Sequence, residues 1–423
     1  MLIPTDFACG SSRVENPSFK RIIPQIGENL KTQPTPAQDT AVNRSTESVK
    51  SWGRRPKIEV MGKISGEFRD MSRLVVGHWA RARNQPAPLR NLTLSLTYRC
   101  NARCVMCDIW QNPTDPKEEV NLDIVRDLAA SRFTQNLVSL SLTGGEPIFR
   151  EDLGEVAGIF SRQIPRCYIS LVTNGLTPSL VMKRTEEVLA KTSCEIWMNV
   201  SIDSLDESYN DVRGIPGGEK KVKETTERLV AKSHQNPRLK VGVLYTMMPE
   251  NFHQALPVLE YANKLGIQYT LNVINGGDVF YQQKPDSTLE WYREHLDEIL
   301  ATFDDLQRAG YNRPLGRKLL SFLPQYLEEK PNRPVTCLSS FTSAFISPFG
   351  DVYPCVPSGD NYKMGNLHEQ PFDELWVSDQ ASEVRQAVNR KECNCLLTCE
   401  TTNSLKFSPS YQFERFRDKV VGL

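Results

Sequence analysis

Between residues 90 and about 280, short apolar runs alternate with segments whose apolar residues recur at helical spacing. The runs predict six buried strands, at Leu92–Thr97, Leu137–Leu142, Tyr168–Val172, Ile196–Ile202, Val241–Thr246 and Tyr269–Val273. Helices are predicted at about 121–131, 151–163, 178–191, 218–233 and 251–265. Strands that alternate with helices pair in parallel through crossover helices. The pattern therefore predicts an α/β fold whose sheet can curl into a partial barrel.

The N-terminal side has a different pattern. Residues 1–55 are polar, rich in proline and weakly periodic, which predicts a disordered segment. Residues 56–89 are predicted to hold an amphipathic helix at about 60–83 and a lead-in to the first strand. The polar face of this helix is basic, with some acidic residues. It suits packing against the protein body, and peripheral contact with a membrane surface or lipid is the alternative.

The C-terminal side is predicted to be mixed. Residues 286–330 form a helical connection, with one long helix at 287–309. Residues 331–405 are read as a loop-rich domain, and residues 406–423 as a C-terminal tail.

Composition narrows the classes of function. The chain has 51 Lys plus Arg and 51 Asp plus Glu, so its net charge is zero. Bulk binding to nucleic acid needs a cationic face, and we expect none. No apolar run reaches the roughly 18 residues of a membrane span. The N-terminal residues lack a basic start followed by an apolar core, so we expect no secretory signal and a cytoplasmic location.

The cysteines carry the most information. The chain has 11, and in a reducing compartment clustered cysteines more often bind metal or do redox chemistry than form disulfides. Eight of them fall into two groups, one near residue 100 and one between residues 337 and 399. The other three, Cys9, Cys167 and Cys194, are read as plain residues.

The first group has the spacing C-x3-C-x2-C directly after the first predicted strand. Cys100, Cys104 and Cys107 can converge from one loop on one metal centre. Structural zinc sites and ordinary [4Fe–4S] clusters take four protein ligands, so three thiolates leave one iron of a cluster open. The alternative is a zinc loop that borrows a distant fourth ligand.

Polar and glycine residues follow the next strands, where ligands bind in parallel α/β folds. The turn after the second strand is Gly144-Gly145-Glu146-Pro147, which lets a ligand approach the backbone and offers acceptors for an amino group. Asn174 ends the third strand. Ser201 and Asp203 end the fourth, and a hydroxyl next to a carboxylate suits sugar hydroxyls. Arg213 follows in a loop and is read as solvated.

Together these motifs resemble those of the radical S-adenosylmethionine (SAM) superfamily. The resemblance implies a partial (β/α)6 TIM-like barrel over residues 90–285, in which Cys100, Cys104 and Cys107 ligate three irons of a [4Fe–4S] cluster. The fourth iron would chelate the amino and carboxylate groups of SAM. The resemblance assigns further SAM contacts to Gly144, Gly145, Glu146, Pro147, Asn174, Ser201, Asp203 and Val273. Met106 departs from the family pattern, which often has an aromatic residue there, but a thioether can also shield the cluster.

The resemblance also implies a reaction. One electron from the reduced cluster breaks the S–C5′ bond of SAM, and the 5′-deoxyadenosyl radical abstracts hydrogen from an unactivated C–H bond. The electron would come from a reducing partner such as flavodoxin or ferredoxin.

The second group resembles the C-terminal SPASM and twitch extensions of radical SAM enzymes. A full SPASM extension carries seven cysteines and two auxiliary clusters, whereas this segment has five, which implies a twitch-like domain with one auxiliary [4Fe–4S] cluster. The firmest ligands are Cys337, Cys355 and Cys399, and Cys393 and Cys395 compete for the fourth place. The alternative from the residues alone is a zinc ribbon-like knot.

The predicted function is radical tailoring of a small metabolite, by oxidation or bond formation. An auxiliary cluster can accept the electron of a substrate radical, which favours oxidation. Maturation of a ribosomal peptide is the alternative within the same chemistry. Outside it stand a non-catalytic iron–sulfur electron carrier and a zinc-stabilised binding protein, neither of which explains the Gly-Gly-Glu-Pro turn.

Overall fold

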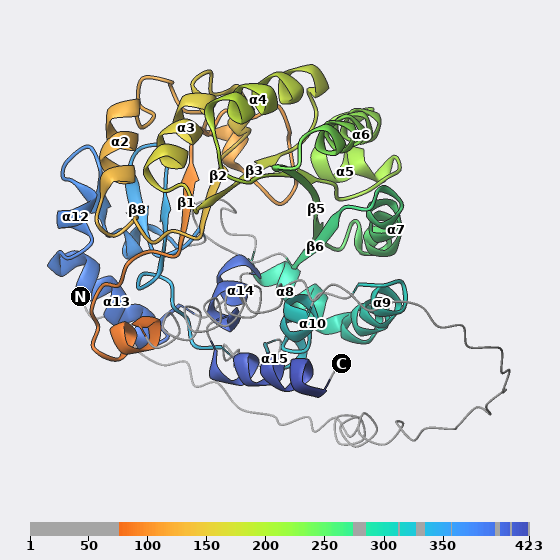
Figure 1. Ribbon diagram of the computed structural model, residues 1–423. Helices are drawn as coiled ribbons and strands as arrows, with labels where there is room; N and C mark the ends of the chain where they lie inside the picture. Colours follow the sequence, from red (N-terminus) through yellow and green to blue (C-terminus); the bar gives the residue numbers. More distant parts are fainter. Residues whose placement is uncertain are drawn as a thin grey trace, which may run out of the picture. The chain divides into compact units, whose positions relative to one another are not determined.

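The computed structural model describes residues 76–273, 285–311, 314–326, 335–356, 358–393, 398–406 and 408–421 (Figure 1). These residues all belong to one compact unit, Val60–Leu423. The predicted disorder of residues 1–55 lies outside the described residues, as does most of the predicted helix at 60–83. Its last part, residues 76–82, is helical.

The six predicted strands form one parallel sheet in chain order, which confirms the α/β fold. They are β1 (Asn91–Ser95), β2 (Ser139–Thr143), β3 (Tyr168–Thr173), β4 (Ile196–Ser201), β5 (Leu239–Met247) and β6 (Gln268–Val273). The helices after them are α2 (Leu122–Ala130), α3 (Leu153–Gln163), α4 (Pro178–Lys191), α5 (Ser208–Arg213), α6 (Gly218–Gln235) and α7 (Ala255–Leu265). Short 3-10 turns lie at η3 (Ile109–Gln111), η4 (Pro147–Phe149) and η5 (Phe252–Gln254).

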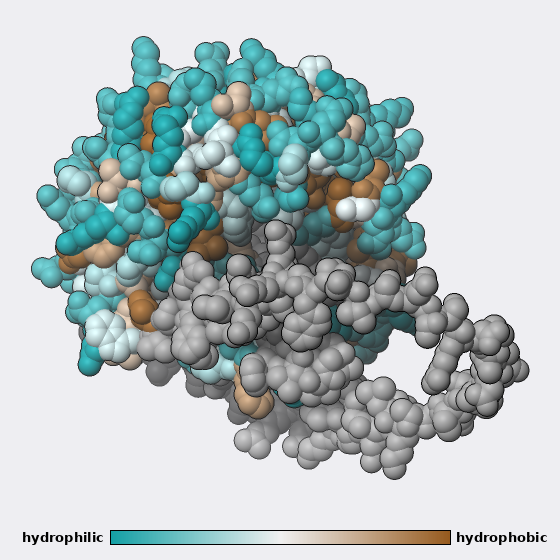
Figure 2. Space-filling view, viewed as in Figure 1, coloured by the Kyte–Doolittle hydropathy of each residue, from teal (hydrophilic) through white to brown (hydrophobic). Residues whose placement is uncertain are grey.

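The two faces of the strands differ in polarity. Alternate residues of a strand point to opposite faces. On β1, Leu92 and Leu94 are buried in the main core, and Leu140 and Leu142 continue this face on β2. The helices α2 to α6 cover this outer face (Figure 1). In Figure 2 these helices present a mainly hydrophilic surface with small apolar spots.

The C-terminal region extends the same sheet. β7 (Ser343–Ile346) pairs parallel with β1, and β8 (Asp351–Tyr353) and β9 (Gly365–Asn366) follow antiparallel. The sheet therefore has nine strands in the order β6-β5-β4-β3-β2-β1-β7-β8-β9. The sequence pattern did not predict this continuation, because β7 and β8 are short.

The helix content of the C-terminal region is higher than predicted. The segment read as loop-rich contains η6 (Asp360–Tyr362), α12 (Phe372–Leu375), α13 (Asp379–Asn389) and α14 (Thr398–Lys406), and the segment read as a tail contains α15 (Pro409–Val421). The helical connection contains α8 (Pro285–Glu294), α9 (Leu296–Arg308), α10 (Pro314–Leu320) and α11 (Leu323–Tyr326).

The long helix predicted at 287–309 is two helices. His295 separates α8 from α9 with a φ of −108°, outside the helical range. Its ring stacks on Trp291 with 4.7 Å between centroids. None of the described helices has both the length and the apolar character needed to cross a membrane.

Candidate active site at the carboxyl ends of the strands

The inner face and the carboxyl ends of β1 to β6 line one cavity of about 980 Å³. The three cysteines of the loop after β1 line it, together with eight other residues that the sequence singled out: Met106, Gly144, Gly145, Asn174, Ser201, Arg213, Val273 and Cys399. Residues far apart in the sequence therefore meet at one site, as expected for the carboxyl edge of a parallel sheet.

The three thiols are sheltered and held by polar neighbours. The Cys100 sulfur accepts hydrogen bonds from Ala102 N (3.4 Å) and Asn174 Nδ2 (3.7 Å), and the Cys104 sulfur accepts one from Arg213 Nη1 (3.5 Å). Burial raises the pKa of Cys100 to about 11 and that of Cys107 to about 12. Binding of a metal centre here must therefore release protons, since the thiolate is the ligand.

The donor set of this loop is three thiolates that line one cavity. In the described part of the chain, no three His, Cys, Asp or Glu side chains lie close enough to hold one metal ion. A structural zinc site takes four protein ligands, whereas three thiolates match a four-iron cluster with one iron left without a protein ligand.

The Gly144-Gly145 turn lies directly against the cysteine loop. Gly145 N donates to Thr97 O (2.7 Å), and Glu146 N donates to Arg99 O (2.8 Å). A Cβ on Gly144, whose φ is +142°, would lie 2.3 Å from Thr97 O, and one on Gly145 would lie 2.5 Å from Arg99 O. Only glycine fits at either position.

Glu146 and Pro147 are buried behind the turn and do not line the cavity. The Glu146 carboxylate accepts hydrogen bonds from Asn174 N (2.7 Å) and Ile148 N (3.5 Å). Burial raises the pKa of Glu146 to about 7, although these hydrogen bonds oppose the shift. Through Asn174 N, the Glu146 carboxylate holds the end of β3.

Asp203 and Arg213 form a buried ion pair beside the cysteines. Asp203 Oδ2 accepts from Arg213 Nε (2.6 Å), and its Oδ1 accepts from Thr246 N (2.8 Å). Asp203 is fully buried and does not line the cavity, whereas Arg213 does. The interpretation of Arg213 as a solvated loop residue was wrong. The sequence gives no sign of its partner, because the pairing depends on how the loop after β4 folds back.

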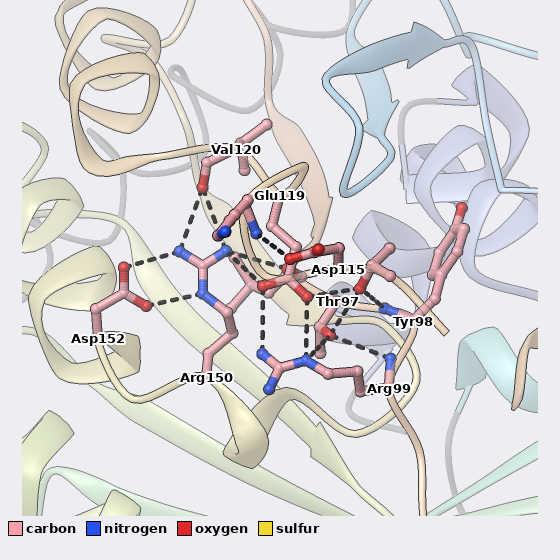
Figure 3. Close-up of polar contacts among 11 residues, drawn as sticks. Thr97, Tyr98, Arg99, Asp115, Glu119, Val120, Arg150 and Asp152 are labelled. Carbon is pink, nitrogen blue, oxygen red and sulfur yellow. Dashed lines mark hydrogen bonds and ion pairs between the residues drawn. The ribbon is translucent and has the colours of Figure 1, made fainter. Parts of the chain in front are cut away.

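A buried polar network anchors both ends of the cysteine loop (Figure 3). Arg150 Nη1 donates to Leu96 O (3.1 Å) and to Val120 O (3.2 Å). Its Nε and Nη2 each donate to the Asp152 carboxylate at 2.8 Å. Nη1 also lies 3.4 Å from the Glu119 carboxylate. One guanidinium thus joins the end of β1, the exit of the cysteine loop and the turn after β2.

Glu119 is the second centre of this network. Its carboxylate accepts from Thr114 Oγ1 (2.6 Å) and Arg99 Nε (3.3 Å) in addition to Arg150. Thr114 Oγ1 lies 3.2 Å from Thr97 Oγ1, which accepts from Arg99 N (3.1 Å). Sequence reasoning missed these residues, since isolated charged residues in loops are usually solvated.

The second cysteine group surrounds the added strands. Cys337 precedes β7, Cys355 follows β8, Cys393 follows α13, and Cys399 lies on α14, where it lines the cavity. Cys355 Sγ lies 3.1 Å from Ser358 Oγ. Burial raises the pKa of Tyr362, and the nearby Cys393 and Cys355 raise this pKa further. Cys395 and Cys9 lie outside the described residues, and Cys167 and Cys194 are buried in the core.

Comparison with known proteins decides the family. Residues 94–262 match the radical SAM superfamily. This region of the chain belongs to the radical SAM superfamily. Residues 337–400 match SPASM, an iron–sulfur cluster-binding domain. Radical SAM and SPASM regions imply a [4Fe–4S] cluster with SAM in the barrel and auxiliary iron–sulfur chemistry in the C-terminal region, in agreement with the sequence motifs.

Named relatives of this radical SAM protein are enzymes of biosynthesis. AlbA of Bacillus subtilis, an antilisterial bacteriocin subtilosin biosynthesis protein, is 22% identical over 308 residues, 71% of this chain and 62% of AlbA. The AdoMet-dependent heme synthase of Methanosarcina barkeri is 26% identical over 305 residues, 68% of this chain and 82% of the synthase. The chain thus spans less than two thirds of AlbA.

A solved structure shares the radical SAM fold. The crystal structure of Streptococcus suis SuiB bound to S-adenosylmethionine superposes with a TM-score of 0.51 at 15% identity. The match covers 81% of this chain and 73% of SuiB. Because the sequence identity is only 15%, this similarity supports a shared fold and nothing more.

Proposed function

We propose that this protein is an enzyme that cleaves SAM reductively and uses the radical to modify a C–H bond of its substrate. The observation that carries the proposal is the meeting of Cys100, Cys104 and Cys107 with the Gly144-Gly145 turn around one cavity. When bound, the cluster and SAM supply one-electron cleavage of the S–C5′ bond and a 5′-deoxyadenosyl radical.

The residues of the chain supply orientation. Gly144 and Gly145 offer carbonyl oxygens to the methionine amine, since both line the cavity while Gly145 N and Glu146 N are bonded to the cysteine loop. Ser201 offers a hydroxyl to the ribose, and Val273 offers backbone groups to the adenine. Asn174, which contacts the Cys100 sulfur, adds a polar contact near the cofactor. Glu146, Pro147 and Asp203 support these contacts from behind the cavity wall.

The lining of the cavity favours a substrate without strong net charge. Its charged side chains are two bases, Arg213 and Lys406, and two acids, Glu195 and Glu400. Arg213 is already paired with Asp203. Most other polar groups are hydroxyls and amides, including Thr93, Ser141, Ser170 and Asn199, which suit an uncharged hydrogen-bonding substrate.

We retain oxidative or bond-forming tailoring of a small metabolite as the first substrate class. Maturation of a ribosomal peptide is the second candidate, and the similarity to AlbA, whose name connects it with bacteriocin biosynthesis, favours it. In either case flavodoxin or ferredoxin is the expected electron donor.

We further propose one auxiliary [4Fe–4S] cluster in residues 331–405. Its ligands are Cys337, Cys355 and Cys399 with either Cys393 or Cys395. Four thiolates leave no iron open, so this cluster would accept or relay an electron and not bind the substrate. Residues 90–285 form the barrel domain in this division of the chain, and residues 286–330 connect the two.

The experiment that tests the function uses anaerobically reconstituted protein. Iron and sulfide are counted per chain, then dithionite and SAM are added and 5′-deoxyadenosine is measured. About eight irons with 5′-deoxyadenosine support both clusters and the cleavage, and about four with product support the first cluster alone. Zinc without iron or sulfide would contradict the proposal from its first motif onward.

A further inference from the structure

A small apolar cluster lies between the loop of the first three cysteines and the hairpin that precedes Cys355. We name it the bridge cluster. Its buried members are Tyr98, Ile109, Phe345 and Tyr353, and Cys107, Phe349 and Val356 pack against it. Members from the barrel loop and from the C-terminal hairpin contribute about equally, so this cluster is an interface inside the molecule.

The bridge cluster touches both cysteine groups. Tyr98 comes two residues before Cys100, and Tyr353 comes two residues before Cys355. The ring of Tyr98 meets that of Phe349, in the hairpin turn, edge to face with 5.6 Å between centroids and an 83° interplanar angle. Val356, directly after Cys355, lines the same cavity as Cys107.

A second contact fixes the same hairpin turn to the same loop. Val120 N, at the exit of the cysteine loop, donates to Pro348 O in the hairpin turn at 2.8 Å. The carbonyl of Val120 is held by both Nη atoms of Arg150 at 3.2 Å (Figure 3). The turn thus has its backbone fixed on one side and its Phe349 ring packed on the other.

When one side chain in a closely packed cluster moves, its neighbours tend to move with it. A gap between them would lose van der Waals contact energy, and an overlap would cost still more energy. A shift of the hairpin at Cys355 must therefore move Phe349 against Tyr98 or open a gap between them. Tyr98 lies on the loop that carries Cys100, Cys104 and Cys107. The position of this loop therefore depends on the position of the hairpin that precedes Cys355.

We propose that Tyr98 is a positioning residue that couples the two cysteine sites, so that filling the auxiliary site sets the loop on which SAM binds. The proposal rests on both cysteine groups holding clusters, as proposed above. Coupling of this kind is reciprocal for binding free energies.

The test is a double-mutant cycle on the reconstituted full chain. Cys355→Ala empties the auxiliary site, and the dissociation constant of SAM is read from the electron paramagnetic resonance change at the reduced first cluster. With Tyr98 present, we expect Cys355→Ala to weaken SAM binding by about tenfold; with Tyr98→Ala, by less than about twofold. Tyr98→Phe keeps the ring and should retain the full effect.

Two further variants keep the test decisive. Phe349 is only half-buried, so Phe349→Ala removes the ring contact at less risk to folding and should abolish the coupling as Tyr98→Ala does. Phe133→Ala is the matched control, because Phe133 is a half-buried aromatic residue before β2 that packs on the main core and not in the bridge cluster, and the tenfold effect should survive it.

The outcomes separate this proposal from the proposed function. If Cys355→Ala weakens SAM binding equally with and without the Tyr98 ring, or not at all, the coupling is wrong. A wild-type chain without auxiliary iron overturns the coupling and the second cluster together. The resonance measurement decides the coupling whether or not 5′-deoxyadenosine forms, so the coupling and the proposed reaction are judged by separate measurements.

Discussion

Glu146 belongs to the Gly-Gly-Glu-Pro turn, but its side chain does not line the cavity. Its carboxylate is fully buried and is bonded to backbone N–H groups of Asn174 and Ile148. Burial is the largest influence on its pKa, and the value of about 7 puts its ionisation in the physiological range.

The pH dependence of stability follows from this pKa. The folded protein holds the Glu146 proton up to about pH 7, whereas the unfolded chain loses it near the ordinary value of 4.5. Protonated Glu146 therefore contributes its full share to the free energy of unfolding below about pH 4.5. This share, about 3 kcal/mol, is lost as the pH rises to 7. Thermal unfolding of cluster-free wild type and Glu146→Gln between pH 5 and 8 measures it.

We expect the variant to gain stability relative to the wild type as the pH rises, since glutamine does not ionise. Melting temperatures that differ by a constant amount over this range would contradict the assignment.

Cys104 gives the sharpest residue-level prediction for the reaction. With one of three thiolates missing, the first cluster should not assemble stably, so Cys104→Ala should yield no 5′-deoxyadenosine above background. Chromatographic measurement of 5′-deoxyadenosine after reduction with dithionite checks this.

Cys167→Ala is the matched control, because Cys167 is a core thiol just before β3. Product formation by Cys104→Ala at the rate of this control would mean that the first cluster is held elsewhere.

Residue roles were predictable where chemistry and spacing coincide. The C-x3-C-x2-C loop and the Gly144-Gly145 turn meet at one cavity because each follows a parallel strand. The burial of Arg213 and the inward position of Glu146 depend on tertiary contacts across loops. Composition and spacing carry no information on such contacts.

At the scale of elements, strands and helices with clear periodicity were placed within a few residues. Strand β3 and helix α4 are examples, since each has a regular pattern over its whole length. Strands β7 and β8 have four and three residues, too few for a period to show. The break at His295 was missed because the apolar period continues through it.

Arg150 holds several elements together and should matter for stability. Arg150→Met would leave the buried Glu119 carboxylate without the more buried of its two arginine partners and free the Val120 and Leu96 carbonyls. We expect a loss of about 3–5 kcal/mol in the free energy of unfolding. Urea denaturation followed by circular dichroism measures this loss.

Arg126→Met is the surface counterpart, since Arg126 pairs with Asp123 while both side chains are exposed. It should change the stability by no more than about 0.5 kcal/mol. If both variants lost a similar amount of free energy of unfolding, the buried network in Figure 3 would stabilise the fold no more than a surface ion pair does.

Cys355 follows the hairpin β7–β8, and its substitution tests the auxiliary cluster site. Cys355→Ala should lose about four irons and keep the first cluster, because β1 and its loop stay paired with β2. Iron analysis with resonance spectra of the reduced protein checks this, and an unchanged iron content would refute the auxiliary site. Tyr98→Phe, which alters no ligand, serves as the control and should keep the wild-type iron content.

At the scale of the whole molecule, barrel and C-terminal region share one sheet. β1 pairs with β2 on one side and with β7 on the other. Trp376 Nε1 donates to Ala87 O (3.1 Å), and Asn84 Nδ2 donates to Ser382 Oγ (3.0 Å), so further contacts join the two regions.

We therefore expect the described regions to unfold in one transition. Circular dichroism, which reports helices, and tryptophan fluorescence should give coincident urea curves for the cluster-free protein. Two separated transitions would show that the C-terminal region melts independently of the barrel.

The central place of β1 also has a consequence for biosynthesis. The ribosome makes β1 first among the sheet strands, but its second neighbour, β7, begins only at Ser343. At roughly 5–20 residues per second, one edge of β1 waits for its partner for tens of seconds. An open edge of this kind can pair with other chains. Nascent chains of this protein are therefore expected to need chaperone protection until β7 has left the ribosome, and fragments that end before it should aggregate.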